Sequence, residues 1–278
     1  MKANLPKEKR LAVNIGVDFD GHCCWTARGL SSPGFVARGD FDAHVGVPRV
    51  LEALRHHGIL GNFFVPGHTM ETYPERFREV TADGHEIGAH GCYHESLPDL
   101  TPDEERRLMQ VQLDQHLRNV GKAPRGYRSP SWDFTDATLG LLEEFGFDWD
   151  SSLMGRDFEA YRPRPFTLGT ETPTKFGPES TVVEFPVSWH LDDIINLDFI
   201  PGMIEGLAST EVVFQRWRDH FDFARQRVPG GIVCFTVHPQ TIGRAHNFLM
   251  FERLLEYMTS FDDVWFTTLS EYFDVLSD

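Results

Sequence analysis

The chain has 278 residues, 41% of them hydrophobic and 24% charged, a composition typical of a globular protein with a sizeable core. Its formal net charge of −16 argues against nucleic acid or an anionic membrane surface as a partner. No stretch approaches the roughly 20 apolar residues of a membrane span, and no apolar signal-peptide segment follows the charged first ten residues. We therefore expect a cytoplasmic protein that binds neither nucleic acid nor membrane.

The cysteines show no recognisable metal or redox spacing. Cys23 and Cys24 are adjacent, and Cys92 and Cys234 stand alone, so neither a zinc ribbon nor a Cys-x-x-Cys pair is present. We expect free thiols in a reducing compartment.

Strand and helix patterns alternate along the chain. Residues 13–19 carry apolar side chains at the odd positions, which is typical of a strand. A capping box at Thr101, with Glu104 at the third helical position, predicts the start of a helix over 101–120. The run 232–237 is typical of a strand buried on both faces. In chain order we also expect a helix at 48–57, a strand at 61–65, a helix at 74–82, a strand at 86–89, a helix at 135–145, strands at 146–150 and 182–186, helices at 211–226 and 248–259, a strand at 264–267 and a helix at 270–276.

About seven strands thus alternate with helices, without an internal repeat or a low-complexity linker. This alternation predicts a parallel α/β architecture in a single domain over residues 1–278. Two connections, 21–46 and 154–181, are longer than is usual in compact domains and are rich in glycine, proline and aromatic residues. We interpret them as lids or oligomer contacts, with irregular surface loops as the alternative.

Two polar clusters follow predicted strands. Asp18 and Asp20 are two residues apart, so their carboxylates face the same side of a strand. His90 and His94 are four apart, and both can reach one metal only if the backbone between them turns, for which Gly91 is suited. One carboxylate with two imidazoles forms a hydrolytic metal set that leaves positions open for water. With 13 histidines in the chain such a pair also arises by chance, so other motifs must support it.

Five segments together provide that support. They are Val17-Asp18-Phe19-Asp20, His90-Gly91-Cys92-Tyr93-His94, Arg128-Ser129-Pro130-Ser131-Trp132, Asp150-Ser151-Ser152 and Phe235-Thr236-Val237-His238-Pro239. In this order they resemble the polysaccharide deacetylase (NodB-homology) family of metal-dependent amide hydrolases, from about Val13 to Phe273. The segment 183–193 is similar to the branch that holds cyclic imidases, metal-independent allantoinases and a peptidoglycan-deacetylase-like protein. One departure is that Gly21 stands where the family usually has a second aspartate.

The resemblance implies a fold and a metal site. The fold would be a distorted (β/α) barrel with about seven parallel strands, and its active site would lie at the carboxyl ends of the strands. Asp20, His90 and His94 would bind a divalent metal, with Zn²⁺ the first choice, and Asp18 would be the base that activates water. Because of the Gly21 departure, Asp18 and Asp20 could also exchange these roles.

The resemblance also assigns the remaining roles. His238 would protonate the leaving nitrogen, which amide hydrolysis requires, and Arg128 would contact the catalytic base. Further residues are expected at the substrate: Trp132 as a wall, with Trp189, Asp150 and Trp25 beside it. Asp192 and Asp193 are expected near the pocket without a chemical role.

These observations predict a metal-dependent hydrolase of non-peptide amide bonds. The missing export signal and the two long connections favour a small cyclic amide or imide, or an allantoin-like compound, over an N-acetylated glycan. The alternatives are a glycan deacetylase, a metal-independent hydrolase and a non-catalytic binding protein. We further expect a homo-oligomer.

Overall fold

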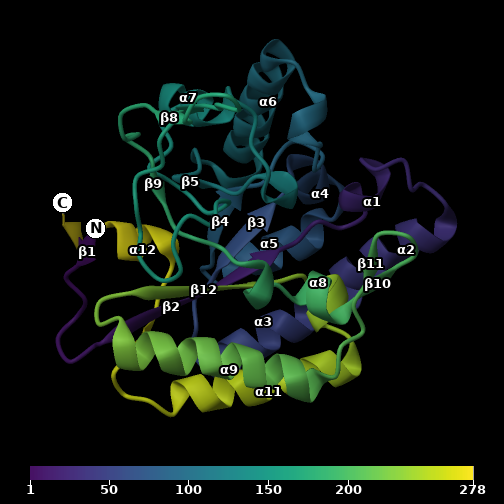
Figure 1. The fold of residues 1–278 in the computed structure, drawn as a ribbon. Helices are drawn as coiled ribbons and strands as arrows, with labels where there is room; N and C mark the ends of the chain where they lie inside the picture. Colours follow the sequence, from purple (N-terminus) through teal and green to yellow (C-terminus); the bar gives the residue numbers. More distant parts are fainter. Residues whose placement is uncertain (278) are drawn as a thin grey trace.

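The computed structural model describes residues 1–277, and its centre is a curled sheet of seven parallel strands (Figure 1). Their order is β12 (Ile232–Val237), β2 (Leu11–Asp18), β3 (Asn62–Val65), β4 (Glu86–Ala89), β5 (Gly126–Tyr127), β6 (Trp149–Asp150) and β9 (Val183–Glu184). An eighth strand, β13 (Val264–Phe266), pairs with the first residues of β2. A parallel bridge joins Asp192, in the segment that follows β9, to Thr236 of β12. The predicted distorted barrel is confirmed.

The longest strands carry the core. Every residue of β2 and β12 is buried, as expected of parallel strands covered on both faces. The main apolar cluster joins these strands to three helices that lie along them in Figure 1, with Trp217 and Phe251 among its large side chains. These helices are α3 (Val47–His56), α9 (Thr210–Arg227) and α11 (Ala245–Thr259).

The other expected helices also form. The capping box is present, since Thr101 accepts the N–H of Glu104 and the Glu104 carboxylate accepts the N–H of Thr101. The helix at 135–145 is shorter than predicted and starts three residues later. The bounds are α5 (Pro74–Ala82), α6 (Pro102–Val120), α7 (Thr138–Glu144) and α12 (Leu269–Phe273). No helix within residues 1–277 is long and apolar enough to cross a membrane.

Several short elements were not predicted. Strand β5 has only two residues, too few to show an apolar alternation. Near the termini, β1 (Lys2–Ala3) pairs with β14 (Leu276–Ser277). The remaining helical turns are α4 (Gly67–Thr72), α8 (Asp193–Leu197), α10 (Pro239–Ile242), η2 (Leu97–Asp99), η3 (Pro130–Trp132) and η4 (Trp189–Leu191).

The connection 21–46 is not the long loop that we expected. It contains α1 (Cys23–Thr26), α2 (Pro33–Phe41) and the π-helical turn η1 (Asp42–Gly46), which runs directly into α3. Two of its glycines permit close packing, because a side chain at Gly39 would collide with His22 and one at Gly46 with Pro239.

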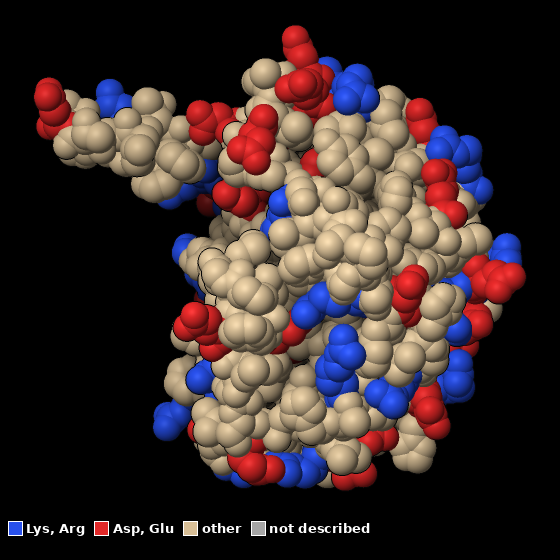
Figure 2. Space-filling view, turned by 90° about the vertical axis from the view of Figure 1, so that its right-hand side faces the viewer, with Lys and Arg blue, Asp and Glu red and all other residues tan. Residues whose placement is uncertain are grey.

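The connection 154–181 is largely irregular, as expected. Its one regular feature is an antiparallel hairpin of β7 (Phe166–Thr167) and β8 (Lys175–Phe176). Figure 2 shows this hairpin as a thin arm that stands away from the body of the molecule. A second, unpredicted hairpin consists of β10 (Phe199–Ile200) and β11 (Ile204–Glu205).

Candidate active site

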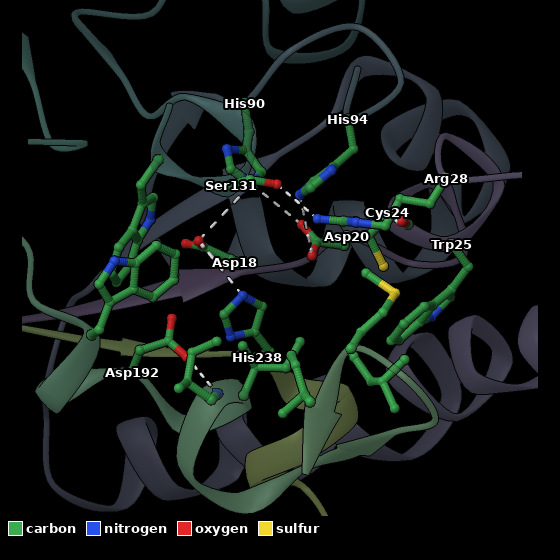
Figure 3. A pocket seen from close by; sticks show the side chains of 17 residues that line it. Asp18, Asp20, Cys24, Trp25, Arg28, His90, His94, Ser131, Asp192 and His238 are labelled. Atoms are coloured by element: carbon green, nitrogen blue, oxygen red, sulfur yellow. Dashed lines mark hydrogen bonds and ion pairs between the residues drawn. The ribbon is translucent and has the colours of Figure 1, made fainter. Parts of the chain in front are cut away.

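The polar residues singled out by the sequence converge on one cavity at the carboxyl ends of the strands (Figure 3). Asp18 ends β2 and Asp20 follows it, His90 follows β4, and His238 follows β12. The cavity has a volume of about 110 Å³. Because parallel strands all end at the same edge of the sheet, segments far apart in the sequence meet here.

One group, which we name the Asp-His-His cluster, consists of Asp20, His90 and His94. Their potential ligand atoms all lie within 4.8 Å of one another. Asp20 lies between the two imidazoles, with Oδ1 3.4 Å from His90 Nε2 and Oδ2 3.7 Å from His94 Nε2. The structure thus brings together the three residues that the sequence proposed as metal ligands.

A tight turn holds the two histidines of this cluster together. The backbone φ angles of Gly91 and His94 are 75° and 60°, so the chain curls back instead of continuing as a strand. The buried Glu95 carboxylate stabilises the turn by accepting the backbone N–H groups of Cys92 and Tyr93 at 2.8–3.0 Å. The turn expected at Gly91 is confirmed.

The donor set of the Asp-His-His cluster fits a divalent cation. Asp20 Oδ1 is buried and has no hydrogen-bond partner among the described residues. Burial raises the pKa of Asp20, but His94 and His90 lower it more, so the carboxylate is ionised. Burial lowers the pKa of His94 to about 4, which leaves a neutral imidazole. His90 Nδ1 lies 2.7 Å from the carbonyl oxygen of Arg128, so Nε2 is the nitrogen that faces Asp20.

Asp18 is held by a buried arginine. Arg128 Nη1 donates to Asp18 Oδ1 at 2.6 Å, and the guanidinium also donates to the carbonyl and hydroxyl oxygens of Ser151. Both ionic side chains are almost fully buried. Asp18 Oδ2 faces the cavity, 3.9 Å from His90 Nε2 and 3.8 Å from His238 Nε2. Arg128 therefore fixes one carboxylate oxygen and leaves the other available.

His238 belongs to a second group, which we name the Asp-Asp-His cluster, with Asp192 and Asp193. Asp193 Oδ1 lies 2.8 Å from His238 Nδ1, and its carboxylate also accepts the backbone N–H of His238. Burial lowers the pKa of His238, but Asp192 and Asp193 outweigh it, so the pKa lies well above its ordinary value. Burial likewise raises the pKa of Asp192 to about 7. This arrangement keeps a proton on His238.

Sequence reasoning had assigned no chemistry to Asp193. It lies 45 residues before His238, and its carboxylate reaches the imidazole only because α8 packs against β12. The signal available in the sequence was the adjacent acidic pair at the start of α8, where Asp192 caps the helix by accepting the N–H of Ile195 and Asp193 is its first residue.

Aromatic side chains form much of the cavity wall. The rings of Trp132 and Trp189 are 4.4 Å apart at 31°, and Trp25 of α1 lines the cavity as well. Ser131 and Trp132 both have positive φ angles, 58° and 56°, a costly conformation that turns the chain sharply after Pro130. The structure therefore places all three tryptophans named from the sequence at the cavity.

The cover of the cavity was not predicted. It comes from α8 and the β10–β11 hairpin, which contribute Ile194, Ile195, Ile200, Met203 and Ile204. Within the described chain, segment 154–181 contributes no lining residue, so only the first long connection reaches the cavity. The hairpin escaped prediction because its strands have two residues each.

Asp150 corrects another expectation. It is fully buried and does not line the cavity, so its predicted contact with substrate is wrong for this structure. Its carboxylate accepts the Ser152 hydroxyl, and Ser152 accepts the N–H of Ser129 beside Arg128. Burial, and then the neighbouring Asp150, raise the pKa of Glu184 well above its ordinary value. Through Ser152 and Ser129, this acidic pair supports the loop that carries Arg128.

Comparison with known proteins identifies the family of the chain. The family model described as "Polysaccharide deacetylase" matches residues 40–149. The peptidoglycan deacetylase of Helicobacter pylori (strain ATCC 700392 / 26695) is 32% identical over 96% of this chain and 96% of its own length. The chain belongs to the polysaccharide deacetylase family. The peptidoglycan deacetylase-like protein FGM2 of Gibberella zeae is 29% identical over 95% of this chain and 85% of its own length.

Solved structures show the same family fold. A crystal structure from Mycobacterium smegmatis, assigned to the polysaccharide deacetylases, is 30% identical, with a TM-score of 0.87 over 98% of this chain and 92% of its own. The crystal structure of Puue allantoinase has a TM-score of 0.82 at 18% identity, over 99% of this chain and 92% of its own, and shows the shared fold alone. As a member of this deacetylase family, the protein is a hydrolase of amide carbon–nitrogen bonds.

Proposed function

We propose that the protein is a metal-dependent hydrolase that opens a small cyclic amide or imide. The observation that carries the proposal is the combination of the Asp-His-His cluster with a small, apolar cavity directly above it. The cluster supplies a metal-ligand set, and the cavity limits the size of what can reach it.

The buried ionic residues have different roles in the proposed hydrolysis. A divalent cation bound by Asp20, His90 and His94, for which Zn²⁺ is our first choice, would lower the pKa of a water molecule and polarise the amide carbonyl. Asp18 is the proposed base: its Oδ2 faces the cavity, while Arg128 Nη1 donates to Oδ1. This division assigns the ligand role to Asp20 because that side chain lies between the two imidazoles.

His238 is the proposed acid. Its Nε2 points toward the cavity, and its raised pKa leaves a proton available for the nitrogen that departs from the carbonyl carbon. Asp193 acts as a positioning residue, since its contact with Nδ1 orients the ring and directs Nε2 to the reaction. In a cyclic amide that nitrogen remains attached to the product.

The cavity dimensions favour a small ring. Its volume of about 110 Å³ lies well below the roughly 300–1,000 Å³ of sites for drug-sized ligands. The indoles of Trp132 and Trp189 offer flat apolar surfaces against which a planar ring can stack. Isoleucines from α8 and the β10–β11 hairpin add further apolar lining to the cavity.

Deacetylation of an N-acetylated glycan is the second candidate. The observation that favours it is the 32% identity to the Helicobacter pylori peptidoglycan deacetylase along nearly the whole chain. The same base, acid and ligand set would release acetate from an acetamide. In that case only the acetyl group would enter the cavity, and the sugar would stay at its mouth.

A paired substrate and metal assay separates these candidates. The purified protein should open succinimide, hydantoin or a dihydropyrimidine faster than it releases acetate from a soluble chitin oligomer. Faster acetate release would establish the deacetylase instead. Removal of divalent metal with a chelator should abolish the preferred activity, and added Zn²⁺ should restore it; full activity of the metal-free protein would rule out metal dependence.

A further inference from the structure

The arm formed by the β7–β8 hairpin presents an apolar surface that the rest of the described chain leaves uncovered. Phe166, Leu168 and Phe176 are 55%, 73% and 60% exposed. Figure 2 shows the arm extending from the body into solvent. A two-stranded hairpin has no core of its own and is at best marginally stable in water. Three exposed apolar side chains on such a hairpin therefore indicate a surface that binds a partner.

The arm nevertheless has a defined shape. Its base is closed by the N–H of Gly177, which donates to the Pro165 carbonyl at 2.8 Å. The Arg164 guanidinium lies 5.0 Å from the centre of the Phe176 ring. At the tip, the N–H of Gly169 donates to the Thr174 hydroxyl at 3.2 Å. These contacts present the apolar side chains in a fixed arrangement.

A groove of about 800 Å³ lies at the base of the same arm. Leu153 and Tyr161 line its apolar part, together with Phe176 of the arm itself. Arg156 also lines the groove, with its guanidinium 5.4 Å from the Tyr161 ring, as do Arg162 and Arg164. The charged lining consists of these three arginines and two carboxylates, Glu159 and Glu179, so the groove has a net positive charge on a chain whose formal net charge is −16.

We propose that the arm binds in this groove on a second copy of the chain, in a reciprocal two-fold contact. Arm and groove are contiguous, because Arg164 and Phe176 belong to both, so one two-fold axis beside the arm creates both contacts at once. Glu171, at the turn between β7 and β8, is the acidic residue of the arm tip and complements the arginines of the groove. Because both copies are strongly acidic, this local attraction opposes their overall repulsion.

The contact is independent of the proposed hydrolysis. No residue of the arm is among those that line the catalytic cavity of the described chain. The oligomeric state of the protein therefore tests the arm contact, whatever the substrate proves to be.

Sedimentation equilibrium of the full-length protein tests the contact. Wild type should form dimers or larger even-numbered assemblies at micromolar concentration, and Leu168→Asp should weaken association at least tenfold. Leu249→Asp is the matched control, because Leu249 on α11 is 67% exposed and lies outside the arm and the groove. A monomeric wild type, or unchanged association of Leu168→Asp, would overturn the proposal.

Two charge reversals test which surface receives the arm. Arg156→Glu and Glu171→Arg should each weaken association, and the double variant should recover most of the loss because the two charges are exchanged between partners. Mixing a Glu171→Cys variant with an Arg156→Cys variant should yield a disulfide-linked dimer under mild oxidation. Failure of both the recovery and the cross-link would show that the arm does not occupy this groove.

Discussion

The two clusters that face each other across the cavity use the same side-chain types in reversed proportions. The Asp-His-His cluster has one carboxylate and two imidazoles, and the Asp-Asp-His cluster has two carboxylates and one imidazole. All six residues are buried. Burial lowers the pKa of His94 to about 4, whereas two carboxylates overcome the same effect and keep the pKa of His238 well above its ordinary value.

The difference shows how composition separates two tasks within one cavity. In the Asp-His-His cluster burial leaves the lone pair of His94 available to a cation, whereas burial lowers the pKa of His90 and Asp20 and Asp18 raise it more. Where carboxylates outnumber imidazoles, the imidazole retains its proton. Asp18 lies between the clusters, within 3.9 Å of His90 and 3.8 Å of His238. The reacting groups can thus be placed between a cation site and a proton donor.

Breaking the Asp-His-His cluster should have the largest effect. His94→Ala should reduce bound divalent metal well below one equivalent per chain and lower kcat/KM by roughly three orders of magnitude or more. Elemental analysis and steady-state kinetics measure both. His246→Ala, at an exposed histidine, is the control and should keep metal and rate. Full metal occupancy in His94→Ala would remove His94 from the ligand set.

Breaking the Asp-Asp-His cluster should spare the metal. His238→Ala should lower kcat by about 10²–10⁴-fold, the usual contribution of a general acid or base, with bound metal unchanged. The loss should shrink for substrates with good leaving groups, because these need less protonation. An unchanged kcat would assign His238 a structural role.

Asp193→Asn should have a smaller effect than His238→Ala, because it changes the pKa of His238 and leaves the imidazole in place. Removing one negative neighbour lowers the pKa of His238, so the alkaline limb of the kcat profile should move to lower pH by on the order of one unit. The rate at the optimum should fall less than in His238→Ala. A pH–rate profile of wild type and variant at saturating substrate measures the shift. An unmoved alkaline limb would mean that another group sets it.

The pair of Asp150 and Glu184 sharpens the comparison, because it contains carboxyl groups without an imidazole. In the folded state the pKa of Glu184 is raised above the unfolded value of about 4.3. The stability that this residue contributes is therefore fully present below the unfolded pKa, and it is lost as pH rises through the pKa of the folded state. Glu184→Gln should therefore lose less stability than wild type between pH 5 and pH 8, by about 1–2 kcal/mol. Urea unfolding at both values tests this, and identical pH dependence in the two proteins would contradict it.

The sequence by itself determined the strand-and-helix order and the meeting point of the main polar residues. An alternating apolar pattern identifies β2, a continuous apolar run identifies β12, and parallel strands must end at the same edge. For this reason the pattern of the chain placed Asp18, Asp20, His90 and His238 at one site, where the structure has them, together with Asp150, which lies outside the cavity. The turn at Gly91 followed from the spacing of the histidines and from the freedom of glycine to adopt a positive φ.

Only the tertiary structure decided how these residues are paired and covered. Asp193 reaches His238 across 45 residues, and Asp150 turns inward to meet Glu184. Neither contact leaves a local pattern, because packing between distant segments creates it. The two-residue strands of β5 and of both hairpins are likewise too short to carry a period. The cavity cover and the exposed arm depend on these short elements, so the shape of the site could not be predicted from its chemistry.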